Sequence, residues 1–363
     1  MRHSKKSAGF EKHWRWLQPL LFSLPAEFAH GLGMRSLQML GALRPMANHL
    51  RKKNRPCRPQ LSMRLFGVDF PNPLGVAAGL DKNAIAIPGL SALGFGFVEV
   101  GTLTPKPQAG NPKPRLFRLV EHGAIINRMG FNNRGAQRAA STLEKLKHRP
   151  LPIGINLGKN KWTELENAAE DYVSAAQTLA PFADYLAINL SSPNTPGLRS
   201  LQSPKALEAL LLQLKKLQCT KPLLVKLAPD LHEEELQKIS EVALSCAIDG
   251  IIATNTTLQR NIAHALASQS GGLSGKPLCA LSTQCIRQIY KATQGRIPII
   301  GVGGVFSAED AYEKIKAGAS LIQLYSGLIY GGPGIARHIL DGLEACLLRD
   351  KVELLSEVVG QQS

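Results

Sequence analysis

Short apolar runs and longer stretches of mixed character alternate along most of the chain. From Leu61 onward, eight apolar runs are separated mostly by segments in which apolar positions recur every three or four residues. The first pattern indicates buried strands and the second indicates amphipathic helices. Eight strand–helix units over roughly 290 residues fit an α/β fold of the (β/α)8 TIM barrel type, because a doubly wound sheet needs fewer strands. The predicted strands are 75–79, 96–101, 152–157, 184–190, 222–227, 249–254, 298–303 and 320–325, and the predicted helices are 84–93, 135–147, 164–180, 204–218, 232–246, 280–294, 307–317 and 334–348.

The ends of the chain and one connection depart from this alternation. Residues 103–134 form a long connection, in which RLFRLV and GAIINRM predict a short hairpin. Residues 17–24 and 25–43 predict two helices ahead of the barrel. The basic, proline-containing stretch that follows predicts a linker. We therefore expect a basic tail and helical element at 1–50, a linker at 51–60, the barrel at 61–348 and a C-terminal tail at 349–363.

Positive charge is concentrated at the N-terminus. The chain has a formal net charge of +16, and residues 1–60 hold twelve lysines and arginines against Glu11 and Glu27. With Trp14 and Trp16 beside an apolar helix, this segment suits the interface plane of a membrane. The alternative is that the helices simply pack on the barrel. Nucleic acid is another acidic partner, but no interleaving of aromatic and basic residues extends beyond this segment, so we expect none to bind.

The composition narrows the class of protein. Hydrophobic residues make up 44% of the chain and charged residues 19%, which is typical of a folded protein and not of a disordered one. The six cysteines form no C-x-x-C pair and no histidine cluster has metal-ligand spacing, so we expect reduced thiols and no metal site. No apolar run reaches the roughly 18 residues that cross a bilayer, and no signal peptide is evident. The chain is therefore expected to be a globular protein that faces the cytosol.

Polar residues stand at the ends of several predicted strands, where a barrel of this type carries its chemistry. Asn156 and Asn189 end the third and fourth strands, and residues 254–256 (TNT) end the sixth. Lys226 lies between two apolar residues of the fifth strand, where an unpaired charge is costly. It has no acidic neighbour in sequence, so we expect an anionic partner from elsewhere. The alternative is a lysine that extends to the barrel rim.

Small residues mark places where the backbone can approach a ligand closely. Ala77, Ala78 and Gly79 form a small-residue floor at the first strand end, and GGLSG follows the sixth strand. GVGG and LYSG end the seventh and eighth strands, which is where barrels of this type usually bind phosphate. A phosphate there, a flat ligand over the floor and an anion beside Lys226 together fit FMN. Its ring becomes anionic on reduction, and Lys226 would stabilise that charge.

Seven motifs, read together, resemble the membrane-associated class 2 dihydroorotate dehydrogenases, which are quinone-dependent FMN enzymes of pyrimidine biosynthesis. The motifs are AAGLDKN, NRMGFNN, SSPNTPGLR, KLAPD, IIATNTT, GGLSGKPL and IIGVGG, and the resemblance covers about residues 17 to 345. It implies that (S)-dihydroorotate is oxidised to orotate, with a membrane quinone as final oxidant. It also implies a peripheral protein, on the cytoplasmic face of a bacterial inner membrane, and we expect a monomer.

The resemblance further implies a role for individual residues. Ser192 would be the catalytic base, passing its proton onward through Thr195 or a water, and His30 and Arg118 would lie near the quinone. FMN would be held by Ala77, Ala78, Gly79, Leu80, Asp81, Thr102, Asn156, Asn189, Lys226, Thr254, Gly275, Gly304, Tyr325 and Ser326. Dihydroorotate would be held by Lys82, Asn127, Arg128, Met129, Gly130, Phe131, Asn189, Asn194, Asn255 and Thr256.

Three other functions fit parts of the sequence. A cytosolic class 1 enzyme that reduces fumarate is disfavoured, because that class usually has cysteine at the position of Ser192 and lacks the N-terminal helices. A phosphate-sugar isomerase or epimerase on the same barrel would need no flavin. A basic binder of nucleic acid or membrane surfaces would leave Lys226 and the polar strand ends unexplained.

Overall fold

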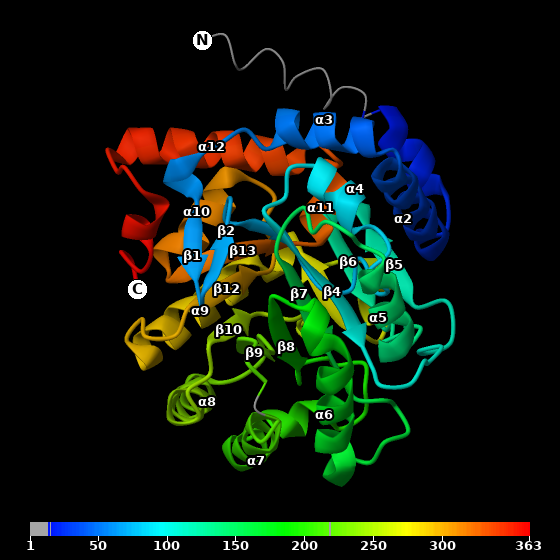
Figure 1. The fold of residues 1–363 in the computed structure, drawn as a ribbon, viewed down its shortest axis with the longest axis vertical. Coiled ribbons are helices and arrows are strands. Elements are labelled where there is room, and N and C mark those ends of the chain that lie inside the picture. Colours follow the sequence, from blue (N-terminus) through cyan, green and yellow to red (C-terminus); the bar gives the residue numbers. More distant parts are fainter. Residues whose placement is uncertain (1–13, 15, 218) are drawn as a thin grey trace.

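The computed structural model describes residue 14, residues 16–217 and residues 219–363. Eight parallel strands close into a barrel in the order β10–β12–β13–β3–β4–β7–β8–β9, which confirms the predicted fold (Figure 1). Each predicted barrel strand is present, with bounds that differ by a few residues at most. The strands are β3 (Leu74–Val76), β4 (Phe97–Leu103), β7 (Ile153–Leu157), β8 (Tyr185–Asn189), β9 (Leu223–Leu227), β10 (Gly250–Ala253), β12 (Ile299–Val302) and β13 (Ala319–Leu324).

Helices surround the barrel on the outside (Figure 1). The predicted helix at 84–93 is shorter than expected, because the carboxylate of Asp81 accepts backbone N–H groups of Ile85 and Ala86 and holds the preceding residues in a turn. One short helix, α11 (Ser326–Gly331), was not predicted. The other helices around the barrel are α4 (Ile87–Ala92), α5 (Ala136–Glu144), α6 (Ala168–Leu179), α7 (Pro204–Lys215), α8 (Glu233–Ser245), α9 (Cys279–Thr293), α10 (Ala308–Lys316) and α12 (Ile335–Asp350).

The barrel strands are apolar on both faces because one face meets the helices and the other fills the interior. Large aromatic rings occupy the interior only where a neighbouring strand supplies glycine. A Cβ atom at Gly75 would lie 2.4 Å from the ring of Phe97, and one at Gly154 would lie 2.1 Å from the ring of Tyr185. These glycines therefore make room for the two rings that fill the barrel.

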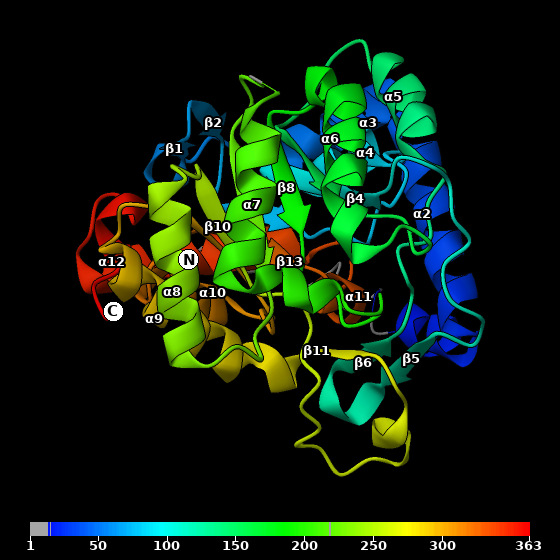
Figure 2. The ribbon, with the colours of Figure 1, turned by 90° about the horizontal axis from the view of Figure 1, so that it is seen from below.

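Two small sheets lie at opposite ends of the barrel (Figure 2). The hairpin of β1 (Met63–Leu65) and β2 (Val68–Phe70) was not predicted, and Phe70 packs against Phe97 at the start of β4, with ring centroids 5.2 Å apart. The predicted hairpin within 103–134 is confirmed as β5 (Leu116–Leu119) and β6 (Ala124–Asn127). Strand β11 (Gly272–Gly275) adds to its edge as an unpredicted third strand.

The N-terminal helices precede the barrel as expected, but a further helix follows them. Residues 16–23 are helical, and α2 (Ala26–Ala42) approaches α4 so closely that a Cβ atom at Gly89 would lie 2.1 Å from a backbone oxygen of α2. The expected linker at 51–60 is wrong at its start, because α3 (Arg44–Asn54) continues through its first four residues. Among the residues that the structure describes, no helix is both long enough and apolar enough to cross a membrane.

The expected C-terminal tail at 349–363 packs against the barrel. Helix α12 extends to Asp350, and Leu355 and Val358 beyond it are fully buried in the main core. Burial of these two apolar side chains fixes the segment, so the folded domain extends to the end of the chain.

Candidate active site

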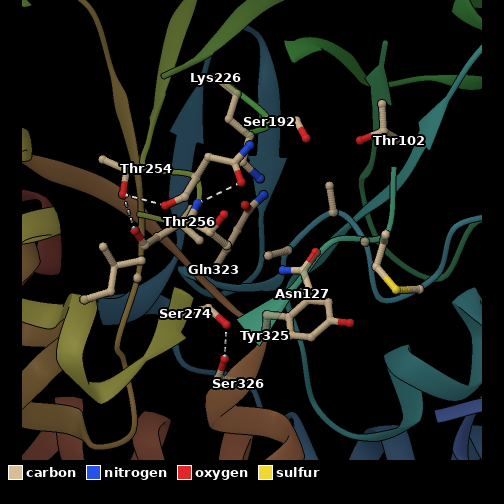
Figure 3. A pocket seen from close by; sticks show the side chains of 18 of the residues that line it. Thr102, Asn127, Ser192, Lys226, Thr254, Thr256, Ser274, Gln323, Tyr325 and Ser326 are labelled. Carbon is tan, nitrogen blue, oxygen red and sulfur yellow. Dashed lines mark hydrogen bonds between the residues drawn. The ribbon is translucent and has the colours of Figure 1, made fainter. Parts of the chain in front are cut away.

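A cavity lies at the carboxyl ends of the barrel strands (Figure 3). Its interior measures about 140 Å³, which is less than the roughly 300 to 1,000 Å³ typical of a ligand site. Twenty of the predicted catalytic, cofactor-binding and substrate-binding residues line this cavity: Ala77, Ala78, Gly79, Lys82, Thr102, Asn127, Met129, Gly130, Phe131, Asn189, Ser192, Asn194, Lys226, Thr254, Asn255, Thr256, Gly275, Gly304, Tyr325 and Ser326.

Four predicted site residues do not line it. Leu80 instead lines a second cavity, and the Asp81 carboxylate is used by the turn before α4. Arg128 points elsewhere, with its guanidinium 4.7 Å from the centre of the Phe117 ring. Asn156 lies beneath the cavity, where it takes part in the hydrogen-bond network described below. Ser274, Leu278, Val302, Gly303, Val305, Gln323, Leu324 and Gly327 line the cavity without having been predicted to bind ligand.

A continuous series of side-chain hydrogen bonds runs from β4 through β7 and β8 to the segment that follows β10. The hydroxyl of Thr102 donates to Asn156 Oδ1 at 2.5 Å, and Asn189 Nδ2 donates to the same oxygen at 3.0 Å. Asn255 Nδ2 donates in turn to Asn189 Oδ1 at 3.2 Å. Because each amide is held at both ends, the amides of Asn189 and Asn255, which line the cavity, present polar groups to a ligand in fixed positions.

Lys226 has a partner that the sequence analysis did not identify. The anionic partner expected from elsewhere is Glu99 of β4, whose Oε1 lies 3.7 Å from Lys226 Nζ, whereas the sequence analysis considered only the reduced flavin ring for this charge. Burial lowers the pKa of the Lys226 ammonium, and the carboxylate of Glu99 counteracts this effect. Glu99 is a charged residue within the apolar run FVEV, just as Lys226 is a charged residue within an apolar strand. The sequence signal that identified Lys226 could therefore also have identified Glu99.

Glycines shape the end of the cavity formed by the loops after β12 and β13. A Cβ atom at Gly304 would lie 2.6 Å from the backbone nitrogen of Cys279, the first residue of α9, and one at Gly327 would lie 2.2 Å from the backbone oxygen of Val305. The hydroxyls of Ser274 and Ser326 are 2.9 Å apart at this end, across the cavity from Lys226 (Figure 3). Backbone N–H groups, hydroxyls and a helix start are the groups that bind phosphate in such barrels.

Two lining side chains each have one buried oxygen atom without a hydrogen-bond partner. Within the described part of the chain, Thr256 Oγ1 and Gln323 Oε1 have none. Leaving such an atom buried and unpaired costs about 1–3 kcal/mol. These atoms, the glycine-lined end and the ammonium of Lys226 fit a polar, phosphate-bearing ligand with a flat ring.

Ser192 lies in the loop after β8 and is buried. The backbone N–H of Asn194 donates to its hydroxyl at 3.2 Å. Arg199 holds this loop, since its Nε donates to the backbone oxygen of Ser191 at 3.0 Å and its NH2 donates to that of Thr256 at 2.9 Å. The loop that carries Ser192 is thus tied to the strand-end segment that carries three other lining residues.

Lys82 is a second cation that lines the cavity, and it is half-buried. Its Nζ donates to the backbone oxygen of Gly79 at 2.5 Å. Burial lowers the pKa of this ammonium to about 8, with Glu27 acting to raise it and Arg115 to lower it. Lys82 is therefore protonated at neutral pH and close to its titration point, with no carboxylate at ion-pair distance among the described residues.

A second cavity of about 560 Å³ lies between the N-terminal helices and the barrel. Its lining is mostly apolar, and it includes His30 and Arg118, the two residues expected near a quinone. Burial, together with the nearby charge of Lys82, lowers the pKa of His30 to about 3, so the imidazole is neutral at pH 7. Tyr325 lines both cavities and so forms part of the wall between them.

Comparisons with known proteins agree on one family. The sequence model described as "Dihydroorotate dehydrogenase" matches residues 60–347. A Myxococcus xanthus protein named "Dihydroorotate dehydrogenase (quinone)" is 50% identical over 348 residues, covering 94% of this chain and 96% of its own. A protein of the same name from Acidithiobacillus ferrooxidans is 50% identical over 345 residues, covering 92% of this chain and 95% of its own. The crystal structure of an Eimeria tenella DHODH in complex with ferulenol has a TM-score of 0.83 and 40% identity, covering 92% of this chain and 95% of its own.

Proposed function

The chain belongs to the dihydroorotate dehydrogenase family, and we propose that it oxidises (S)-dihydroorotate to orotate with FMN as hydride acceptor and a membrane quinone as final oxidant, in de novo pyrimidine biosynthesis. The observation that carries this proposal is that Tyr325 lines two chemically different cavities. One is polar and suits a small anion and a flavin, and the other is mostly apolar and suits a quinone. A flavin enzyme that uses two such substrates needs both, next to each other.

The residues of the polar cavity fit FMN. Gly304 and Ser326, with the loops around them, would hold its phosphate, and the floor of Ala77 to Gly79 would face its ring, beside Lys226. When bound, FMN supplies the acceptor for a hydride. The positive charge of Lys226 would stabilise negative charge on the ring in a site that excludes most water.

The remaining lining residues would bind and deprotonate the substrate. The Lys82 ammonium would bind the carboxylate of dihydroorotate, and the amides of Asn127, Asn194 and Asn255 would hold the pyrimidine ring. Ser192 would take a proton from C5 while a hydride leaves C6. A serine hydroxyl is a weak base, so the proton must pass onward, through Thr195 or a water. Positioning and proton removal are therefore the contributions we assign to this part of the chain.

The second cavity would bring the quinone from the membrane to the wall formed by Tyr325. Its own wall is built partly by α2 and the helical residues 16–23, whose outward faces are apolar: Trp16, Leu20, Phe28 and Met39 are between 62% and 84% exposed. Such a face beside basic residues suits the membrane interface. We therefore propose that the protein binds peripherally to the cytoplasmic face of a bacterial inner membrane.

A visible absorption spectrum of the purified protein, taken before and after anaerobic addition of dihydroorotate, tests the proposal. We expect flavin bands that bleach on addition and return when a soluble quinone analogue is added. A colourless protein would instead favour the isomerase or epimerase alternative. Reoxidation by fumarate and not by the quinone analogue would contradict the quinone assignment.

A further inference from the structure

We propose that Glu99 is a positioning residue that holds the Lys226 ammonium charged and in place beside the space assigned to the flavin ring, and thereby makes reduction of the flavin more favourable. This inference rests on the proposed function. Glu99 is 1% exposed and does not line the cavity, whereas Lys226 does. The ammonium therefore lies between the carboxylate and the space where the ring would bind.

The contact spans the barrel interior. Glu99 lies on β4 and Lys226 on β9, and strands β7 and β8 separate them in the barrel. The distance of 3.7 Å between Lys226 Nζ and Glu99 Oε1 is longer than a hydrogen bond. Charge attraction thus acts on the ammonium while its N–H groups remain available to a ligand in the cavity.

Three donors hold the Glu99 carboxylate in place. Asn156 Nδ2 donates to Oε1 at 2.8 Å, and Gln323 Nε2 and the Tyr185 hydroxyl donate to Oε2 at 2.7 and 3.1 Å. They come from β7, β13 and β8, so the carboxylate is fixed from several sides of the barrel. All three neighbours donate, which matches a charged carboxylate that can only accept.

Burial alone would favour the neutral amine of Lys226. The pKa of this ammonium is lowered by desolvation, and Glu99 is the acidic group of the described chain whose charge counteracts this effect. Removing one partner of a buried ion pair leaves the other charge uncompensated. Without the Glu99 carboxylate, Lys226 should therefore lose its proton and no longer stabilise a negative ring.

The test is the midpoint potential of the bound flavin, measured by equilibration with a reference dye in Glu99→Gln, which keeps the shape of the side chain and removes its charge. We expect reduction to become at least tenfold less favourable, which is about 30 mV for a two-electron couple. Tyr185→Phe is the matched control, because it removes one hydrogen-bond donor to Glu99 and leaves the carboxylate charge. The equilibrium constant for reduction of its flavin should stay within twofold of the wild-type value. A Glu99→Gln potential that is unchanged or higher would overturn the proposal.

A double-mutant cycle separates this role from a purely structural one. In a Lys226→Met background, Glu99→Gln should not lower the potential further, since the charge that Glu99 stabilises is already gone. Additive effects would show that Glu99 acts independently of Lys226. This double variant contains no unpaired buried charge and so should fold even if Glu99→Gln alone does not. Glu99→Asp, which retains the charge, should recover at least half of the shift.

Failure of the inference is distinguishable from failure of the proposed function. A wild-type protein that binds no flavin, or whose flavin dihydroorotate does not reduce, would contradict the function itself. A protein whose flavin is reduced by dihydroorotate, but whose potential does not respond to Glu99→Gln, would leave the function standing and remove only the role of Glu99.

Discussion

Binding of the product orotate should weaken as the pH rises above about 8, because its carboxylate is assigned to the Lys82 ammonium. Burial lowers the pKa of Lys82 to about 8 in the ligand-free protein. Below this pH the ammonium is present and attracts the carboxylate, and above it the neutral amine does not. For each pH unit above the pKa, the fraction of Lys82 that is charged falls about tenfold, which corresponds to about 1.4 kcal/mol of binding free energy. We therefore expect affinity to fall about tenfold at pH 9 and about a hundredfold at pH 10, relative to pH 7.

The dissociation constant of orotate, measured from the change in flavin absorbance between pH 6.5 and 10, provides the assay. Lys82→Arg is the matched control, because its guanidinium stays charged over this range and any titration of the ligand itself remains. The affinity of this variant should vary much less with pH. A wild-type dissociation constant that is flat to pH 10, or a decline that is equal in wild type and Lys82→Arg, would refute the reasoning.

Four further predictions test other parts of the two cavities. Ser192→Ala should retain FMN but slow flavin reduction by dihydroorotate by about 10² to 10⁴, whereas near-wild-type rates in a rapid-mixing experiment would remove Ser192 from this role. Gly304→Ala adds a Cβ atom 2.6 Å from the backbone of Cys279 at a φ of +70°, so the purified variant should contain little FMN, and a full complement by absorbance would contradict this. Deletion of residues 1–43 should impair quinone reduction far more than flavin reduction, and an equal loss of both half-reactions would exclude the quinone route. Burial lowers the pKa of His30 to about 3 in the folded protein, against about 6.5 in the unfolded chain, so the stability that His30 contributes is complete above pH 6.5 and is lost as the pH falls toward 3. In urea unfolding, the free energy of unfolding of the wild type should therefore fall by about 2 kcal/mol more than that of His30→Gln between pH 7 and 5. Equal falls in the two proteins would exclude His30 as the cause.

The barrel could be predicted from sequence because its strands are buried on both faces. Such strands appear as continuous apolar runs, and eight of them leave few alternative folds. The elements that were missed lack this signal. Strands β1 and β2 have three residues each, and β11 is the polar and glycine-rich GLSG. Helix α11 has six residues, too few to show a helical period. These elements form only because the barrel presents surfaces for them to pair with or pack on.

The cavity lining was predictable to a similar extent and for a similar reason. A polar residue near the end of an apolar strand is expected at the barrel mouth, and this is how Asn189 and Lys226 were identified. Loop residues are harder to assign, because neighbours in a loop point in different directions; Lys82 faces the cavity while Asp81 is used by the turn beside it. The pairing of Lys226 with Glu99 joins two strands that are distant in sequence and not adjacent in the barrel, so no local pattern could reveal it.

The two cavities also explain why one domain can bind such different substrates. An anion in the second cavity would lose its hydration among mostly apolar side chains, and the Arg118 guanidinium in its wall already donates to the backbone oxygens of Leu21 and Leu24. In the first cavity, by contrast, the ammonium of Lys82 and the amides of the strand ends replace water around a carboxylate. Burial raises the pKa of Tyr325 to about 12, so its hydroxyl stays neutral and adds no charge to the wall that both cavities share. The polar cavity therefore favours the anionic substrate and the apolar cavity favours the quinone. Because Tyr325 lines both cavities, both molecules can approach the same cofactor.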